Sequence, residues 1–260
     1  MKLSKLVSIF AFVLVSGISA VAAPGNISVG TVEGVVTVTA ADGTQTRLVA
    51  GDVLRQNTRI ATDKDSSAKV VLANGTEILL KPNTILDLSQ FEQNNPSAVE
   101  GLDYSSFTSE PEATGGSMTT VRILKGTALF DVAKLLTGSS LTVKTHAGDV
   151  AVKGTTFYVS VSGTAVTAGC IDGAISVRPN GRAALMLTSG KSATISSSGA
   201  VSFERASSSL TAEASEAFKA VEDDRISSFG GSGSFDVTMP PAAVDGPNAD
   251  RIPVNSASSL

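Results

Sequence analysis

The clearest structural pattern of the sequence lies in residues 143–159, which read Val143-Lys144-Thr145-His146-Ala147-Gly148-Asp149-Val150-Ala151-Val152-Lys153-Gly154-Thr155-Thr156-Phe157-Tyr158-Val159. Apolar and polar residues alternate on both sides of its glycines, and strand side chains alternate between the two faces of a sheet. Each strand then has one face to bury and one that can be wet. The stretch therefore predicts short β-strands joined by turns.

The motif residues of this stretch have structural interpretations. Gly148 and Gly154 suit turns or a close approach of backbone, because glycine has no Cβ. A threonine hydroxyl can bond to nearby backbone, which suits Thr145 and Thr155. Phe157 and Val159 alternate, so they share a face that excludes Tyr158. A structural role therefore accounts for all six residues without any catalytic function. They are Thr145, Gly148, Gly154, Thr155, Phe157 and Val159.

The same pattern extends outward over residues 29–203, with a turn roughly every ten residues, which is typical of all-β proteins. Residues 68–72 and 77–80 are apolar runs separated by Asn74-Gly75. An Asn-Gly pair between such runs predicts a hairpin with a type I′ turn, in which both central residues have positive φ.

A weak internal repeat also runs through the chain. Residues 33–38 (EGVVTV) are echoed by residues 172–177 (DGAISV), and each copy is followed by a turn and then by Gly51 or Gly190. Residues 125–130 (KGTALF) form a third, partial copy. A repeated unit of charge, glycine and strand favours a twisted β-roll or solenoid-like stack, with a sandwich-like arrangement as the other form. The alternative is chance similarity in a chain rich in Gly, Val and Thr.

Three segments depart from the strand pattern. Residues 92–118 hold few apolar residues and several Pro and Gly, which predicts a flexible insertion. Residues 210–229 carry apolar side chains at helical spacing and predict one amphipathic helix, which could dock on the β-domain or on a partner. Residues 230–260 are rich in Gly, Pro, Ser and Asp and predict a disordered tail.

The N-terminus has the three parts of a secretory signal peptide. Two lysines precede an apolar run, and small residues follow, so we expect cleavage after residue 22 and a short lead-in over 23–28. The apolar run is shorter than the ~20 residues that a membrane-spanning helix needs. We expect an exported protein, periplasmic or extracellular, with no membrane span in its mature chain.

Composition and charge exclude several classes of function. The net charge is −4, and removing the two leader lysines leaves −6, which argues against nucleic acid. Cys170 is the only cysteine and is expected to be a buried hydrophobe, so no internal disulfide forms. His146 is the only histidine, so neither a His-based triad nor a zinc site with several imidazoles can be assembled. We predict no catalytic residue, cofactor or metal.

Two local patterns resemble sites and are discounted. Residues 66–69 spell Ser-x-x-Lys, but that nucleophile motif needs a helix, and in a strand Ser66 and Lys69 point to opposite faces. Asp63 and Asp65 lack the further oxygen ligands, glycine and glutamate of a calcium loop.

The order of motifs resembles the FecR domain over residues 29–203. The most specific part is the Val-x-Thr-x-x-Gly of residues 143–148, followed by the Val-x-Gly-Thr-x-Phe-x-Val of residues 152–159. FecR regulators carry a cytoplasmic segment before a membrane span and often end in a small signal-receiving domain. Here a leader starts the chain, and a helix and tail end it. The resemblance therefore implies an exported FecR-type β-module present alone.

The resemblance, the leader and the missing active site together predict a non-enzymatic interaction module of the bacterial cell envelope, acting in signalling or regulation. Its partner would be another envelope protein or a second copy of itself. One alternative is a structural or self-assembling surface protein, since sheet edges can pair between copies. Another is a glycan or small-ligand binder, which the lack of Trp and the two Tyr weaken.

Overall fold

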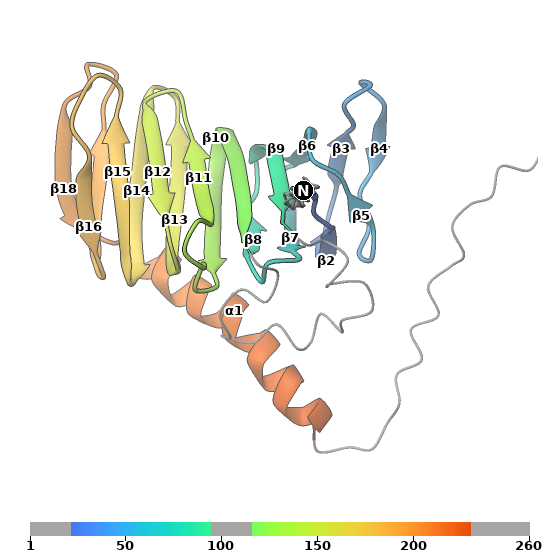
Figure 1. The fold of residues 1–260 in the computed structure, drawn as a ribbon. Coiled ribbons are helices and arrows are strands. Elements are labelled where there is room, and N and C mark those ends of the chain that lie inside the picture. The colour runs from blue at the N-terminus through green and yellow to red at the C-terminus, as the bar shows by residue number, and fades with distance from the viewer. Residues whose placement is uncertain (1–21, 95–115, 230–260) are drawn as a thin grey trace, which may run out of the picture.

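The computed structural model describes residues 22–94 and 116–229, with side chains described as far as residue 218. Most of these residues form short strands in two stacked sheets, with one helix outside (Figure 1). The prediction of an all-β domain with one C-terminal helix is confirmed, in its sandwich-like form. Three predicted segments lie wholly or largely outside the described residues. They are the signal peptide up to residue 21, residues 95–115 of the insertion, and the tail 230–260.

Sheet A contains, in spatial order, β4 (Gln45–Arg47), β3 (Val36–Thr39), β6 (Thr58–Thr62), β9 (Ile85–Gln93), the first part of β10 (Ser117–Val132), β11 (Ser140–Lys144), β12 (Gly148–Val152), β15 (Ala174–Pro179) and β16 (Leu185–Thr188). The short β1 (Ala23–Pro24) pairs with the end of β9. Strands β9 and β10 extend to Gln93 and from Ser117, two residues inside each limit of the predicted insertion.

Sheet B contains, in spatial order, β5 (Val53–Leu54), β2 (Ile27–Glu33), β7 (Ser67–Leu72), β8 (Glu77–Leu80), the second part of β10, β13 (Thr155–Ser162), β14 (Ala165–Asp172), β17 (Lys191–Ile195) and β18 (Val201–Arg205). Every described strand pair is antiparallel except β10–β11.

Strand β10 belongs to both sheets. Its residues 117–125 pair with β9, and its residues 126–132 pair with β8 and β13. The change occurs at Gly126, whose φ is +87°. A Cβ at this position would lie 2.5 Å from the Cα atom of Thr84, so only glycine fits this corner.

The predicted repeat has a structural counterpart. In the first copy the chain leaves β2 in sheet B, crosses at Gly34, forms the β3–β4 hairpin in sheet A, and returns past Gly51 to β5 beside β2. In the second copy β14, β15, β16 and β17 repeat this path, with crossings at Gly173 and Gly190. The partial third copy is the Lys125-Gly126 corner of β10. The charge and glycine of each copy therefore mark a crossing between sheets.

The Asn74-Gly75 hairpin forms as predicted between β7 and β8, but its predicted turn type is wrong. Only Gly75 has positive φ, and its N–H donates to the Leu72 carbonyl at 2.9 Å. This is the three-residue loop that ends in a left-handed glycine. Asn74 instead uses its side chain, which accepts from the Thr76 N–H at 3.1 Å and donates to Ser117 at 2.9 Å.

The main core lies between the sheets and contains the inward faces of nearly all strands. Its centre is a stacked pair of rings, Phe130 and Phe157, with centroids 4.7 Å apart and planes 8° apart. Both rings are fully buried, and so is Val159. Burying a side chain of this size contributes about 1.5–3 kcal/mol.

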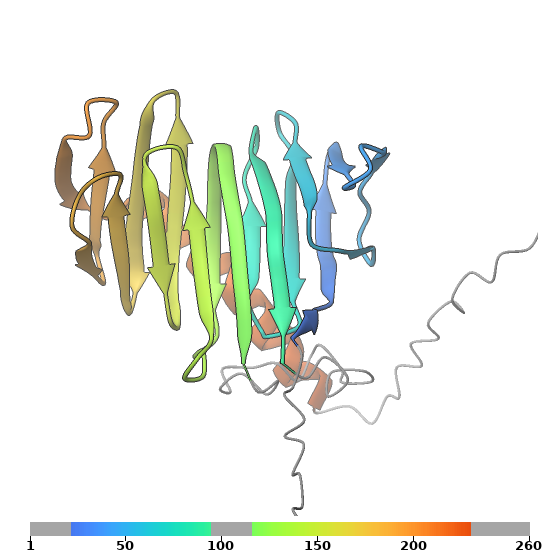
Figure 2. The same ribbon diagram turned by 45° about the horizontal axis from the view of Figure 1, so that its top comes forward.

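A second, smaller core lies on the outer face of sheet B, under helix α1 (Ser208–Phe229). Leu79, Leu129 and Tyr158 of the sheet contact Ala214 of the helix and are buried there. The expectation that these strands have one wet face is therefore wrong for sheet B, because the helix docks on the β-domain and covers it. Figure 2 shows the helix crossing behind the sheets. The helix lacks the combination of length and apolar content that crossing a bilayer requires.

We predict that Phe157→Ala lowers the free energy of unfolding by roughly 3–5 kcal/mol, since it leaves a cavity against Phe130. Phe203→Ala is the matched control, because that ring is 61% exposed and its removal should change stability by about 0.5 kcal/mol or less. Urea unfolding of both variants measures this, and equal losses would show that the assignment of the core is wrong.

We also predict that Gly126→Ala destabilises the protein more than Gly43→Ala. Both glycines have φ near +86°, so an alanine at either position costs about 1–2 kcal/mol in backbone strain. Only at Gly126 does the added methyl meet backbone, which adds about 1–3 kcal/mol of overpacking. Thermal unfolding checks this, and equal melting temperatures would contradict the crowded corner.

Candidate functional site

The predicted motif residues lie in two places, at opposite ends of β12. Thr145 and Gly148 form the β11–β12 turn, and Gly154, Thr155, Phe157 and Val159 lie just before or within β13. The Thr145 hydroxyl donates to the Gly148 carbonyl at 2.7 Å and accepts from the Gly148 N–H at 3.2 Å. A Cβ on Gly148 would lie 2.3 Å from the Arg178 carbonyl oxygen, so this glycine allows β12 to start against β15.

The other motif residues make contacts within the fold. Gly154 lies close to the backbone of Lys134, because a Cβ added to Gly154 would be only 3.0 Å from the Lys134 Cα atom. The Thr155 hydroxyl donates to the Ala174 carbonyl at 3.0 Å, while Phe157 and Val159 face the main core.

The groups that could carry chemistry are dispersed. Cys170 is buried, and burial, aided by the charge of Asp172, raises the pKa of its thiol to about 11. His146 is exposed, with Nε2 3.2 Å from the Thr164 carbonyl oxygen. Ser66 accepts from the Val35 N–H at 2.9 Å and so supports the crossing at Gly34. Among the side chains described in residues 22–94 and 116–218, no group of three or more His, Cys, Asp or Glu could hold a metal ion.

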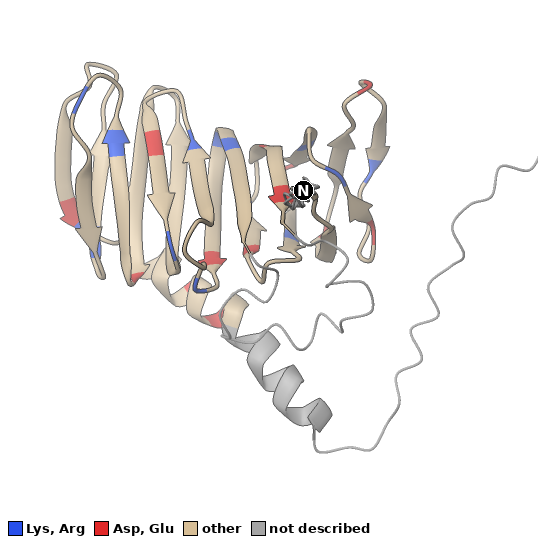
Figure 3. Ribbon diagram, viewed as in Figure 1, with Lys and Arg blue, Asp and Glu red and all other residues tan. Residues whose placement is uncertain are grey.

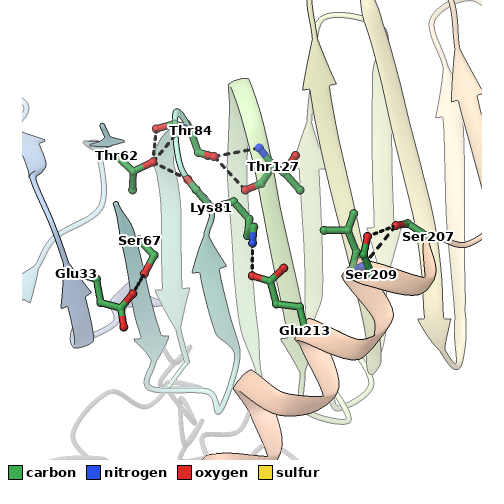
Figure 4. Close-up of polar contacts among 10 residues, drawn as sticks. Glu33, Thr62, Ser67, Lys81, Thr84, Thr127, Ser207, Ser209 and Glu213 are labelled. Atoms are coloured by element: carbon green, nitrogen blue, oxygen red, sulfur yellow. Dashed lines mark hydrogen bonds and ion pairs between the residues drawn. The ribbon is translucent and has the colours of Figure 1, made fainter. Parts of the chain in front are cut away.

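The outer face of sheet B is closed by polar contacts as well as by packing. Lys69 Nζ lies 3.2 Å from Glu77 Oε2, with both side chains about nine-tenths buried, and donates to the Ala217 carbonyl of the helix at 2.7 Å. Lys81 also pairs with Glu213 of the helix (Figure 4).

The start of the helix is fixed to the same face. Ser207 precedes α1, its N–H donates to the Tyr158 hydroxyl at 3.0 Å, and its own hydroxyl accepts from the Leu210 N–H at 3.4 Å. The Ser207 side chain thus caps the helix, and Tyr158 anchors the cap to sheet B.

The outer face of sheet A has no such cover among the described residues. The strand register places a row of charged residues across it, one from each of six neighbouring strands. We call this the charged row, and it consists of Arg59, Asp87, Arg122, Lys144, Asp149 and Arg178. Figure 3 colours the charged positions on the ribbon.

The register places each member of the charged row opposite the next. At one end, the Arg59 guanidinium makes two hydrogen bonds to the Asp87 carboxylate, at 2.6 and 3.0 Å, and this pairing raises the pKa of Arg59. Sequence reasoning missed the row, because its members come from strands far apart in the chain. The sequence shows only that each member occupies a solvent-facing position in a strand whose polar and apolar residues alternate.

Comparison with known proteins gives a family match over the centre of the fold. The model of the family "FecR protein" matches residues 58–176, from β6 into β15. Two solved structures are similar to part of the chain, both of a "putative anti-sigma factor" from Parabacteroides distasonis ATCC 8503, at 1.65 and 2.50 Å resolution. Each is 17% identical, with 56% of this chain and 59% of that chain covered and TM-scores of 0.42 and 0.41. No curated protein matches the chain.

We predict that Lys69→Met destabilises the protein by about 3–5 kcal/mol, because it leaves the buried Glu77 carboxylate without its cation. The double variant Lys69→Met/Glu77→Leu should recover most of that loss, since it removes both charges.

The control for this prediction is Asp87→Asn, which breaks the exposed Arg59 pair and should cost about 1 kcal/mol or less. Denaturant unfolding measures all three variants. A double variant as unstable as Lys69→Met alone would contradict a buried ion pair under the helix.

Proposed function

Because the chain carries a FecR domain over residues 58–176, we propose that it is a non-enzymatic interaction module of the bacterial cell envelope that acts in signalling or regulation. It is exported by its N-terminal leader and works in the periplasm or outside the cell. Its partner is another envelope protein. The six motif residues, from Thr145 to Val159, serve the fold rather than recognition.

The observation that carries the proposal is the difference between the two outer faces. Sheet B is covered by α1 through an apolar cluster and a buried ion pair. The outer face of sheet A is mainly polar, although it also exposes Met118, Leu124 and Met186, and the described part of the chain places nothing on it. Charged and hydroxyl side chains on a rigid sheet hold fixed positions, which suits specific recognition of another protein. All but one member of the charged row fall inside the matched family region.

Self-association is the second candidate, and one end of the sandwich favours it. Strand β18 pairs only with β17 among the described strands, and its central residue, Phe203, is 61% exposed. Nearby in sheet A, β16 pairs only with β15 and exposes Met186. Uncovered edge strands can pair with a second chain. Size-exclusion chromatography with light scattering tests this candidate, and a monomer at high concentration would exclude it.

The test of the main proposal is site-specific photo-crosslinking. Thr142→Cys places a thiol on the outer face of sheet A, and Ser198→Cys places one in the exposed β17–β18 turn. Each variant is labelled with a benzophenone maleimide at pH 7 and irradiated in envelope extract from its own organism. The native Cys170 does not interfere, because it is buried and its raised pKa keeps the thiol protonated.

We expect one defined protein adduct from Thr142→Cys and none from Ser198→Cys, with unlabelled wild-type protein competing for the adduct. No adduct from either position, or the same mixture from both, would contradict the proposal that sheet A binds a partner.

A further inference from the structure

We infer that the charged row binds an acidic, extended segment of the partner polypeptide. This inference rests on the proposed function and names the chemistry of its partner. The row lies on the outer face, since its neighbours along each strand point into the main core. Neighbouring strands are about 4.8 Å apart, so the five steps from Arg59 to Arg178 span about 24 Å.

The charges of the row are balanced at one end only. Arg59 is neutralised by Asp87. Arg122, Lys144 and Arg178 make no ion pair within 4 Å in the described structure, and Asp149 is the one acid among them. This half of the row therefore carries a net charge of +2, on a chain whose overall charge is −4.

This half of the row contains one pair of like charges on neighbouring strands. Arg122 stands directly opposite Lys144 in the parallel β10–β11 pair. Like charges opposite each other destabilise a sheet. Asp87 and Asp149 stand opposite Arg122 and Lys144 on their other sides, but neither forms an ion pair with them within 4 Å, so they offset the repulsion only in part. Sequences break such local rules mainly at functional sites, so the pair points to an anionic ligand.

The surroundings of the row favour a polypeptide over a bulk polyanion. Along one side, the row is flanked by small side chains that let a second backbone approach, namely Thr120, Thr142, Ala151 and Ser176. Three unpaired cations are too few for nucleic acid, whose binding typically neutralises 6–10 phosphates. The net negative charge of the chain also repels extended anionic surfaces.

The spacing of the cations defines the ligand further. Arg122 and Arg178 are three strand steps apart, or about 14 Å. An extended peptide rises about 3.4 Å per residue, so carboxylates at positions i and i+4 match this distance and share one side of the peptide. The residue midway between them falls between Lys144 and Asp149, whose charges are opposite, so it needs no charge of its own.

The test uses a fluorescein-labelled peptide whose only charged residues are two glutamates four positions apart. Its partner probe has glutamine at both positions. Binding to the full-length mature protein is followed by fluorescence anisotropy at 50 mM NaCl. We expect the glutamate probe to bind at least about tenfold more tightly than the glutamine probe, and to weaken as salt is added.

Lys144→Glu should weaken binding of the glutamate probe at least about tenfold. Lys191→Glu changes the net charge equally, on an exposed β17 residue of sheet B, and should bind like the wild type. Lys144→Thr removes both the repulsion with Arg122 and the attraction to Asp149, so it should lose binding while its melting temperature changes little. This combination separates recognition from a structural role.

The inference would be overturned if Lys144→Glu and Lys191→Glu lost affinity for the glutamate probe equally. It would also be overturned if the wild type bound the glutamate and glutamine probes equally well. Equally tight binding to phosphatidylglycerol vesicles would also overturn it in favour of a general anion surface. Adding Lys144→Glu to the Thr142→Cys crosslinking variant separates this inference from the proposed function. If the adduct persists, the face binds its partner without the charged row, and only the inference fails.

Discussion

The structure depends on a single strand that belongs to both sheets. Strand β10 pairs in sheet A up to Lys125 and in sheet B from Gly126 onward. Figure 4 shows how hydroxyls hold the chain at this corner, where the Thr84 hydroxyl donates to the Thr127 carbonyl and accepts from the Thr127 N–H, both at 3.0 Å. The Thr62 hydroxyl accepts from the Thr84 N–H at 2.9 Å. The two sheets are thereby fixed to each other in the middle, and the rest of each sheet is added outward from that strand.

This arrangement gives the domain two outer faces with different properties. The face of sheet B is apolar enough, through Leu79, Leu129 and Tyr158, to need a cover, and α1 supplies it. The face of sheet A carries mostly polar and small side chains, with Met118, Leu124 and Met186 exposed among them, and needs no cover to be stable in water. A module with one face closed by its own chain can use the other for recognition without exposing a large apolar surface.

The sequence predicts local structure well, because local structure has local causes. Alternating side chains identify the strands, helical spacing identifies α1, and the Asn74-Gly75 pair marks a hairpin that forms. The burial of Tyr158 could not be predicted, since it depends on a helix that starts fifty residues later. The charged row was missed for the same reason. Alternation shows that Lys144 is on the wet side of its strand, but only the pairing of strands shows that Arg122 and Arg178 lie beside it.

Native-state hydrogen exchange with mass spectrometry can measure whether β10 unites the two sheets into one cooperative domain. Amides of residues 117–125 and of residues 126–132 should be among the slowest to exchange, and both groups should open together with the same free energy. If the two parts of β10 exchanged in separate steps, with one sheet opening while the other stayed protected, the sheets would be independent units that β10 does not unite.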